Sequence, residues 1–283
     1  MDPLVSIIVP TLNQGRYIEQ TLASIVGQGW PRLELIVIDG GSKDETASVV
    51  ERYRAHVTHF VSEPDRGQAD AINKGFRLAK GDVLAWLNSD DYYLPCALQK
   101  GLAALGESLT KPRLAYGGCL AFWEGSARAQ AWLPEPFDRE TLKTKACLNQ
   151  PSTFWTRALW EKTGELNDSY HFVLDWDWFL RASEHGEFIP VPELLSAYRF
   201  HAAHKSSSGN SRRTDEVIAL VKQHAGEEWA AAFRDVAAQL DTLTESLERL
   251  RGLGLYRLRT VVHRDLYSRH GAKVKVALSQ LRV

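Results

Sequence analysis

The stretch that decides the fold runs from Val5 to Asn13 and reads Val-Ser-Ile-Ile-Val-Pro-Thr-Leu-Asn. Its first five residues form a compact apolar run that Pro10 stops, which is typical of a buried strand. A second run of this kind, Leu33 to Ile38, ends at an Asp-Gly-Gly turn. Between the two runs, residues 14–29 carry apolar side chains at helical spacing. The chain therefore begins with a strand, a helix and a second strand.

The alternation of strand and helix continues through the first hundred residues. Ser42, with Glu45 three residues later, predicts a capping box and a helix that extends to about residue 55. Further strands are predicted over residues 57–61 and 82–87, with a helix over residues 69–79 between them. Short Gly-rich joints between such elements predict an α/β fold, a Rossmann-like and mostly parallel sheet flanked by helices.

The pattern is looser after Leu94. Helices are predicted over residues 96–105, 176–185, 214–225 and 227–251, and strands near residues 114–116 and 152–155. The Ser/Gly-rich stretch at residues 206–210 is the best boundary between domains. We therefore expect an α/β domain over residues 1–210 and a helical C-terminal extension over residues 211–283.

The charge of the chain is balanced overall but not along its length. The 283 residues contain 34 Lys or Arg and 35 Asp or Glu, which speaks against a nucleic-acid partner. Residues 249–283, however, hold nine basic side chains and one acid, a net of +8, which leaves 25 basic and 34 acidic residues, a net of −9, before them. Three scattered cysteines and the absence of an apolar run long enough to span a bilayer predict a cytoplasmic protein.

In open parallel sheets, ligands bind beyond the carboxyl ends of the strands. The polar residues expected there are Thr11, Asn13, Asp39, Glu63, Asp65, Arg66, Asn88, Ser89, Asp90 and Asp91. Carboxylates crowded at one edge repel each other, which indicates a divalent cation, a phosphate with its counter-ion, or bound hydroxyls. The pair Asp90-Asp91 suits Mg²⁺ or Mn²⁺, and the alternative is that it caps the N-terminus of the following helix. Asp39 either contacts a ligand or only forms a tight turn with the two glycines, and the sequence favours neither.

Five motifs occur in the order of a known family. They are Ser6–Asn13, Ile38–Thr46, Ser62–Gly67, Asp70–Gly75 and Leu87–Asp91. Together they resemble the family 2 glycosyltransferases, which have the GT-A fold, and the likeness covers roughly residues 4–205. Neither a Gly-x-Gly-x-x-Gly loop nor a P-loop is present, which speaks against a dinucleotide oxidoreductase or an NTPase of that type.

The resemblance implies an inverting transferase that moves a sugar from a UDP, GDP or dTDP donor to an acceptor hydroxyl in bacterial-type polysaccharide or glycolipid assembly. By the same resemblance, Thr11 and Asp39 hold the nucleoside, Asp70 lines the donor pocket, and Asp90 binds the metal. The full set implied for the donor is Pro10, Thr11, Asn13, Asp39, Arg66, Asp70, Asn88, Ser89, Asp91, His201 and Lys205. The set implied for Mg²⁺ or Mn²⁺ is Asp90, Asp91 and His201.

Inverting transfer needs one general base, which takes the proton of the acceptor hydroxyl. The resemblance implies Asp175, which we expect at the N-cap of the helix that begins near Trp176; Asp177 is the competitor. Trp176 and Trp178 either stack on an acceptor sugar or pack the helix. His201 and then Lys205 are the candidates for stabilising the departing diphosphate.

Two departures from the family pattern leave an alternative open. Asn88 stands where the first acid of the Asp-x-Asp element is usual, and Gly40 stands where a second acid usually follows Asp39. A nucleotide-sugar binding protein with impaired catalysis would also fit these changes, and a Rossmann-like methyltransferase is a weaker third hypothesis. The acceptor is expected to be a saccharide or a lipid-linked sugar. The basic segment 249–283 predicts either peripheral contact with the inner face of the membrane or a homodimer contact.

Overall fold

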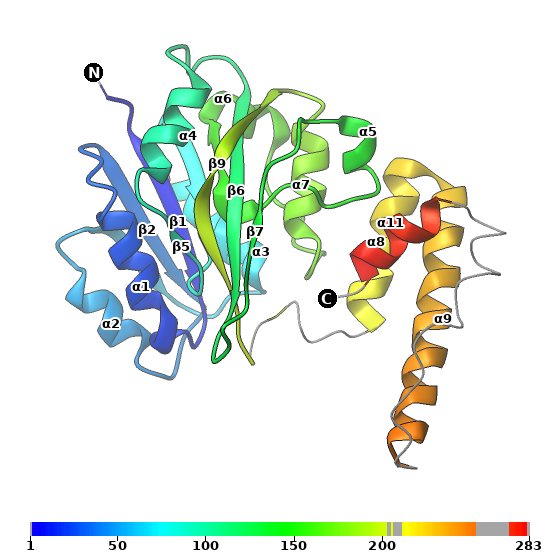
Figure 1. The fold of residues 1–283 in the computed structure, drawn as a ribbon. Coiled ribbons are helices and arrows are strands. Elements are labelled where there is room, and N and C mark those ends of the chain that lie inside the picture. Colours follow the sequence, from blue (N-terminus) through cyan, green and yellow to red (C-terminus); the bar gives the residue numbers. More distant parts are fainter. Residues whose placement is uncertain (1, 203–204, 206–210, 253–271, 282–283) are drawn as a thin grey trace. The chain divides into compact units, whose positions relative to one another are not determined.

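The computed structural model describes residues 2–202, 205, 211–252 and 272–281 (Figure 1). The chain forms two compact units. The first unit comprises residues 1–138 and 147–205, and the second comprises residues 139–146 and 206–283.

Four parallel strands form one half of the sheet in the first unit. They are β1 (Val5–Thr11), β2 (Leu33–Asp39), β3 (Val57–Ser62) and β4 (Val83–Trp86). The helices that connect them are α1 (Gly15–Val26), α2 (Thr46–Arg52) and α3 (Gln68–Leu78). The strand order is β3-β2-β1-β4, so the carboxyl ends of all four strands meet at one edge of the sheet. The predicted α/β fold with a mostly parallel first half is confirmed.

The other half of the sheet is mixed. Its strands are β5 (Tyr92–Tyr93), β6 (Arg113–Trp123), β7 (Ala129–Trp132), β8 (Thr153–Thr156) and β9 (Glu187–Phe200). The short strand β8 pairs antiparallel with both β4 and β6, and β6 pairs parallel with β9. The remaining elements of this half are α4 (Ala97–Leu105), a 3₁₀ turn η1 (Gln150–Ser152), α6 (Arg157–Thr163) and α7 (Leu174–Ala182).

Apolar side chains cover both faces of the sheet. On one face, Leu22 of α1 and Leu98 of α4 belong to the same buried cluster as Val9 of β1. On the other face, Trp86 of β4 packs edge-on against Trp178 of α7, with ring centroids 6.4 Å apart. Burial on both faces explains why the central strands are continuous apolar runs.

The second unit is helical. It contains α5 (Arg139–Leu142), α8 (Ser211–Ala225), α9 (Glu227–Gly252) and α11 (Lys273–Leu281). Leu220 of α8, Phe233 of α9 and Ala277 of α11 are fully buried and form its apolar centre. The predicted basic docking segment falls largely on residues 253–271, outside the described residues. Within the described part of the chain, no helix has the length and apolar character needed to cross a membrane.

Two local predictions are wrong. The predicted capping box at Ser42 does not form, because the Ser42 hydroxyl donates to Asp39 and α2 begins later, at Thr46. There the Asp44 carboxylate accepts the Thr46 backbone N–H at 3.0 Å. Asp175 is also not an N-cap residue, because α7 begins at Leu174, before Asp175 and not after it as predicted. Asp175 therefore lies in the first turn of the helix.

Candidate active site

Asp39 lies at the carboxyl end of β2, as predicted, and it is fully buried. Its two oxygens accept the Ser42 backbone N–H at 3.1 Å, the Ser42 hydroxyl, and the Ser62 hydroxyl at 2.6 Å. A carboxylate offers about four acceptor positions, so these bonds satisfy the Asp39 side chain. Asp39 therefore holds the turn after β2 to the end of β3.

Asp65 occupies the space that a side chain at position 40 would fill. A Cβ atom built on Gly40 would lie 2.6 Å from Asp65 Oδ2. The other carboxylate oxygen, Oδ1, accepts the backbone N–H of Gly67 at 2.9 Å, which fixes the orientation of the group. The structure thus places a carboxylate from the β3–α3 loop beside the turn whose own second acid is missing.

The loop after β1 is clamped to the loop after β2. Asn13, in the left-handed region at φ 53°, donates its backbone N–H to Ser42 Oγ at 2.7 Å. Its side-chain oxygen accepts the Lys43 N–H at 2.8 Å. Thr11 lies before this loop, and its buried hydroxyl has no hydrogen-bond partner among the described residues. Pro10, also in the predicted donor set, is a buried residue of β1 that pairs with Ile38.

A chain of polar side chains replaces the missing acid at position 88. Asn88 Oδ1 accepts a hydrogen bond from Gln68 Nε2 at 2.8 Å. Lys205 Nζ in turn donates to Gln68 Oε1 at 2.8 Å. The two predicted donor-site residues Asn88 and Lys205 are thereby joined through Gln68, which the sequence interpretation missed. Ser89, next to Asn88, is buried.

Asp90 and His201 come together from distant parts of the chain. His201 Nε2 lies 3.1 Å from Asp90 Oδ2, and the His201 side chain is almost fully buried. Asp91 turns the other way, where its Oδ1 accepts the Arg199 backbone N–H at 3.1 Å. Burial, together with the nearby charge of Asp90, holds the pKa of the Asp91 carboxyl well above its usual range.

These positions correct the predicted metal set. Among the described residues, no group of three or more His, Cys, Asp or Glu side chains could hold a metal ion. Asp90 and His201 remain as a two-residue set, because Asp91 Oδ1 is directed to the Arg199 backbone N–H instead. Their separation of 3.1 Å fits two neighbouring ligands of an octahedral ion with bonds of about 2.1 Å. Mg²⁺ and Mn²⁺ commonly take few protein ligands together with substrate phosphates, so the two residues fit such an ion.

Arg66 and Asp70 form an ion pair at the start of α3. The Arg66 guanidinium lies 3.0 Å from Asp70 Oδ1 and also 3.0 Å from Asp168 Oδ2. The hydrogen bond from Arg66 holds the pKa of the Asp70 carboxyl below its usual range. Both residues were predicted at the donor site, and the structure shows that they also bind each other and the loop before α7.

The two candidates for the general base differ in their surroundings. Asp177 is buried, and its Oδ2 accepts a hydrogen bond from Arg181 Nε at 3.0 Å. Asp175 is half-buried, and one of its oxygens accepts the N–H of Trp176 at 2.8 Å. Trp176 and Trp178 are both buried and so pack the helix. Of the two acids, only Asp175 has a partly exposed side chain.

Comparison with known sequences assigns the chain that forms this site to a known family. The family model described as Glycosyl transferase family 2 matches residues 6–156, more than half of the chain. A PGL/p-HBAD biosynthesis glycosyltransferase of Mycobacterium bovis is 31% identical over 205 residues, which cover 69% of this chain and 73% of that protein. The sheet, the polar side chains at its carboxyl edge and these likenesses define a glycosyltransferase. The chain belongs to glycosyl transferase family 2.

Solved structures share the fold. The mannosyltransferase PcManGT of Pyrobaculum calidifontis, in complex with GDP-Man and Mn²⁺, superposes with a TM-score of 0.60 and 18% identity, covering 99% of this chain and 87% of that one. S. aureus TarS 1–349 in complex with UDP-GlcNAc has a TM-score of 0.60 and 20% identity, covering 81% and 70%. The protein is thus a glycosyltransferase with a GT-A-like fold.

Proposed function

We propose that the first unit is an inverting glycosyltransferase domain that moves a sugar from a nucleoside diphosphate to an acceptor hydroxyl during polysaccharide or glycolipid assembly. The observation that carries this proposal is the Asp90–His201 pair, 3.1 Å apart, at the carboxyl edge of the parallel strands. Ligands of open α/β sheets bind at this edge, so the pair lies where a donor diphosphate would be bound.

Asp90 and His201 would hold Mg²⁺ or Mn²⁺. The ion, when bound, neutralises charge that develops on the leaving diphosphate. The Mn²⁺ complex of the mannosyltransferase that shares this fold supports the assignment. The side chain of His201 is further held by Tyr17, whose ring centroid lies 4.4 Å from the imidazole, so His201 keeps its position beside Asp90.

Asp175 would act as the general base. Its partly exposed carboxylate in the first turn of α7 is able to accept the proton of an acceptor hydroxyl while that oxygen attacks the sugar. Asp177 cannot do so without breaking its buried pair with Arg181. One base on the side opposite the leaving group is what inversion requires.

Thr11 and Asp65 would contact the nucleoside. Thr11 has a buried hydroxyl that no described residue engages, and Asp65 presents Oδ2 beside Gly40. The solved structures with this fold bind UDP-GlcNAc in one case and GDP-Man in the other, so both bases belong in a donor screen.

The test measures donor binding and turnover separately. Thermal stabilisation by UDP-, GDP- and dTDP-sugars, with Mn²⁺ and with EDTA, identifies the donor and its dependence on metal. We expect Asp175→Asn to lower sugar transfer by at least about a hundredfold, as loss of a general base does, while the donor still stabilises the protein. Asp177→Asn is the control, which should lose stability but keep turnover per folded molecule.

The outcomes separate the competing hypotheses. Unchanged transfer by Asp175→Asn would remove Asp175 as the base. Donor binding by the wild type without any sugar release, across saccharide and lipid-linked acceptors, would favour the nucleotide-sugar binding protein. No stabilisation by any donor would overturn the proposed function as a whole.

A further inference from the structure

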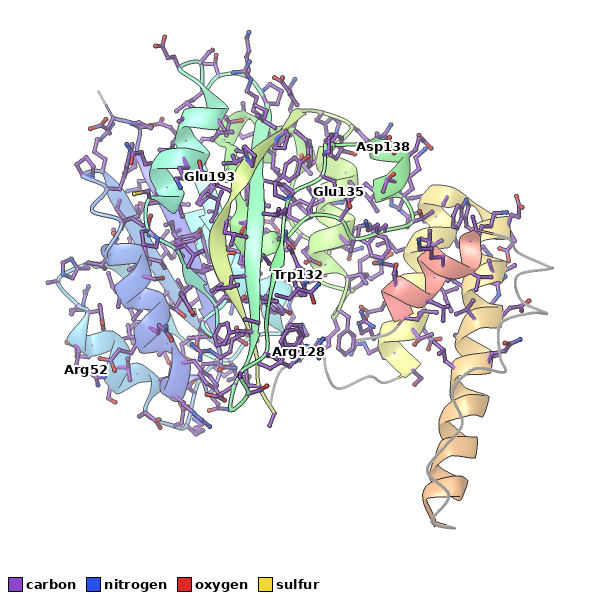
Figure 2. All side chains as sticks on the ribbon, in the orientation of Figure 1. Arg52, Arg128, Trp132, Glu135, Asp138 and Glu193 are labelled. Atoms are coloured by element: carbon purple, nitrogen blue, oxygen red, sulfur yellow. The ribbon has the colours of Figure 1, made fainter. Side chains whose placement is uncertain are left out.

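Four half-buried aromatic side chains gather on strands β6, β7 and β9. Trp123 stacks on Phe200 with ring centroids 4.6 Å apart and planes 3° from parallel. Trp132 meets Phe200 and Tyr198, with centroids 6.1 Å apart in both pairs. Figure 2 shows Trp132 on the strands of the mixed half of the sheet, with Arg128 nearer the end of the hairpin. We call these four side chains the aromatic cluster.

The cluster lies on the same face of the sheet as the proposed general base. Arg199 points toward α1, where its guanidinium donates to Gln20 and lies 5.0 Å from the centroid of Tyr17. Side chains alternate along a strand, so Tyr198 and Phe200 project from the opposite face. That is the face on which α7, the helix of Asp175, packs.

The cluster is also continuous with the donor edge. Phe200 directly precedes His201, the partner of Asp90. On the other side, the backbone oxygen of Trp132 accepts a hydrogen bond from Asn149 Nδ2 at 3.4 Å. The next residue, Gln150, donates to the backbone oxygen of Trp86 at the end of β4. A molecule on the cluster would therefore lie at the same edge of the sheet as the Asp90–His201 pair.

The surroundings of the two tryptophans differ. Trp123 is covered on both faces, by Phe200 on one side and by the Arg128 guanidinium, 3.7 Å from the ring centroid, on the other. Trp132 meets Phe200 at 84° and Tyr198 at 42°, and among the described residues no aromatic ring lies flat on it. Within the same part of the chain, the indole N–H of Trp132 makes no hydrogen bond, and the neighbouring Leu133 is 65% exposed.

We propose that Trp132 is the stacking surface for a sugar ring of a saccharide acceptor. A pyranose has one face of C–H groups and a rim of hydroxyls, which matches a flat indole with a spare N–H donor. A lipid chain would use the apolar face but leave the N–H without a partner. This inference rests on the proposed transferase function and adds the chemical class of the acceptor and its position.

The test uses the full chain with Mn²⁺ and saturating UDP or GDP. Binding of cellotetraose, chitotetraose, maltotetraose and a mannotetraose is measured by saturation-transfer NMR and titration calorimetry. We expect at least one tetrasaccharide to bind the wild type. Trp132→Ala should weaken that binding about tenfold, which corresponds to about 1.4 kcal/mol. Trp132→Phe, which keeps a flat ring, should stay within about threefold of the wild type, since it loses only the N–H donor and part of the ring area.

Trp30 provides the matched control. It is also a half-buried tryptophan, but its indole N–H donates to Pro3 before β1, at the opposite end of the strands. Trp30→Ala should leave saccharide binding unchanged. Equal binding by the wild type and Trp132→Ala, or no binding of any tetrasaccharide by the wild type, would overturn the inference.

Two further readouts keep this result separate from the proposed function. Thermal stabilisation by the donor should be the same in the wild type and Trp132→Ala. If donors stabilise the wild type but no saccharide binds it, only the acceptor proposal is refuted and the proposed transferase function stands. Sedimentation velocity of both proteins reports self-association. A dimer that disappears with Trp132→Ala would assign the cluster to a second copy of the chain and overturn the saccharide proposal.

Discussion

Replacing Gly40 with alanine tests whether Asp65 supplies the carboxylate that the turn after β2 lacks. The new Cβ would lie 2.6 Å from Asp65 Oδ2 and 3.1 Å from its Cγ. Gly40 is not among the residues with positive φ, so alanine adds no backbone strain there. The cost must therefore fall on Asp65, whose carboxylate has to rotate and release the Gly67 N–H that it accepts at 2.9 Å.

The size of the effect follows from two opposing contributions. Loss of a hydrogen bond to a partly exposed carboxylate destabilises the fold by about 1 kcal/mol. A Gly→Ala change without strain stabilises by about 0.4–1 kcal/mol, because the unfolded chain loses freedom. For Gly40→Ala in the wild-type background, the lost hydrogen bond and the gain from the Gly→Ala change nearly cancel in the free energy of unfolding. In an Asp65→Ala background only the stabilising contribution is left, so the coupling free energy should be about 1 kcal/mol.

The assay is urea unfolding of a double-mutant cycle, the wild type with Gly40→Ala, Asp65→Ala and the double variant. Asp65→Asn is the matched control, because it keeps the bulk beside Gly40 and should preserve the conflict. A second series measures the binding of UDP and GDP, which Gly40→Ala should weaken only when Asp65 is present. If Gly40→Ala changes the unfolding free energy equally in both backgrounds, the assignment of Asp65 to this position is refuted.

Three further predictions concern the thiols, the acid stability and the metal. Burial raises the pKa of the Cys119 thiol to about 12, so in a Cys147→Ser background a thiol reagent at pH 8 should modify exposed Cys96 and spare Cys119 until urea is added. Arg66 lowers the pKa of Asp70, so the stability from this pair is present at neutral pH and is lost as the pH falls below about 4; melting temperatures of the wild type and Asp70→Asn should converge there. His201→Ala should raise the Mn²⁺ concentration needed for half-maximal transfer about tenfold or more, and an unchanged requirement would contradict the two-residue metal set.

The parallel half of the fold was predictable because its signal is local. Strands β1 and β2 are continuous apolar runs, and each is separated from the next strand by a helix-spaced segment. The mixed half has no such signal. Strand β9 contains Pro190 and Pro192, and its pairing with β6 shifts register around Gly118. Both partners of β9, the strands β5 and β6, lie more than seventy residues away in the chain, so no short window of sequence indicates this strand.

The site was predictable only as far as strand ends could place it. The rule that ligands bind beyond carboxyl ends located Thr11, Asp39 and Asp90 correctly at one edge of the sheet. It could not supply their partners, because Ser62 reaches Asp39 from another strand and His201 reaches Asp90 across more than a hundred residues. Such contacts depend on how distant loops fold back, which spacing within one motif does not encode.

The two departures from the family pattern acquire a different meaning once these partners are known. At position 40 the carboxylate of Asp65 fills the space beside the glycine. At position 88 the charge has been replaced by an amide that Gln68 and Lys205 hold in place. Because Gln68 bonds to both residues, the positive charge of Lys205 lies one side chain away from Asn88. An acid at position 88 would instead have placed a negative charge there, which a metal ion would have to balance. Asp65 is thus available to contact the nucleoside and Lys205 to contact the diphosphate. An active transferase and a binding protein that has lost catalysis both need these contacts, so the release of sugar from the donor is the measurement that distinguishes the two.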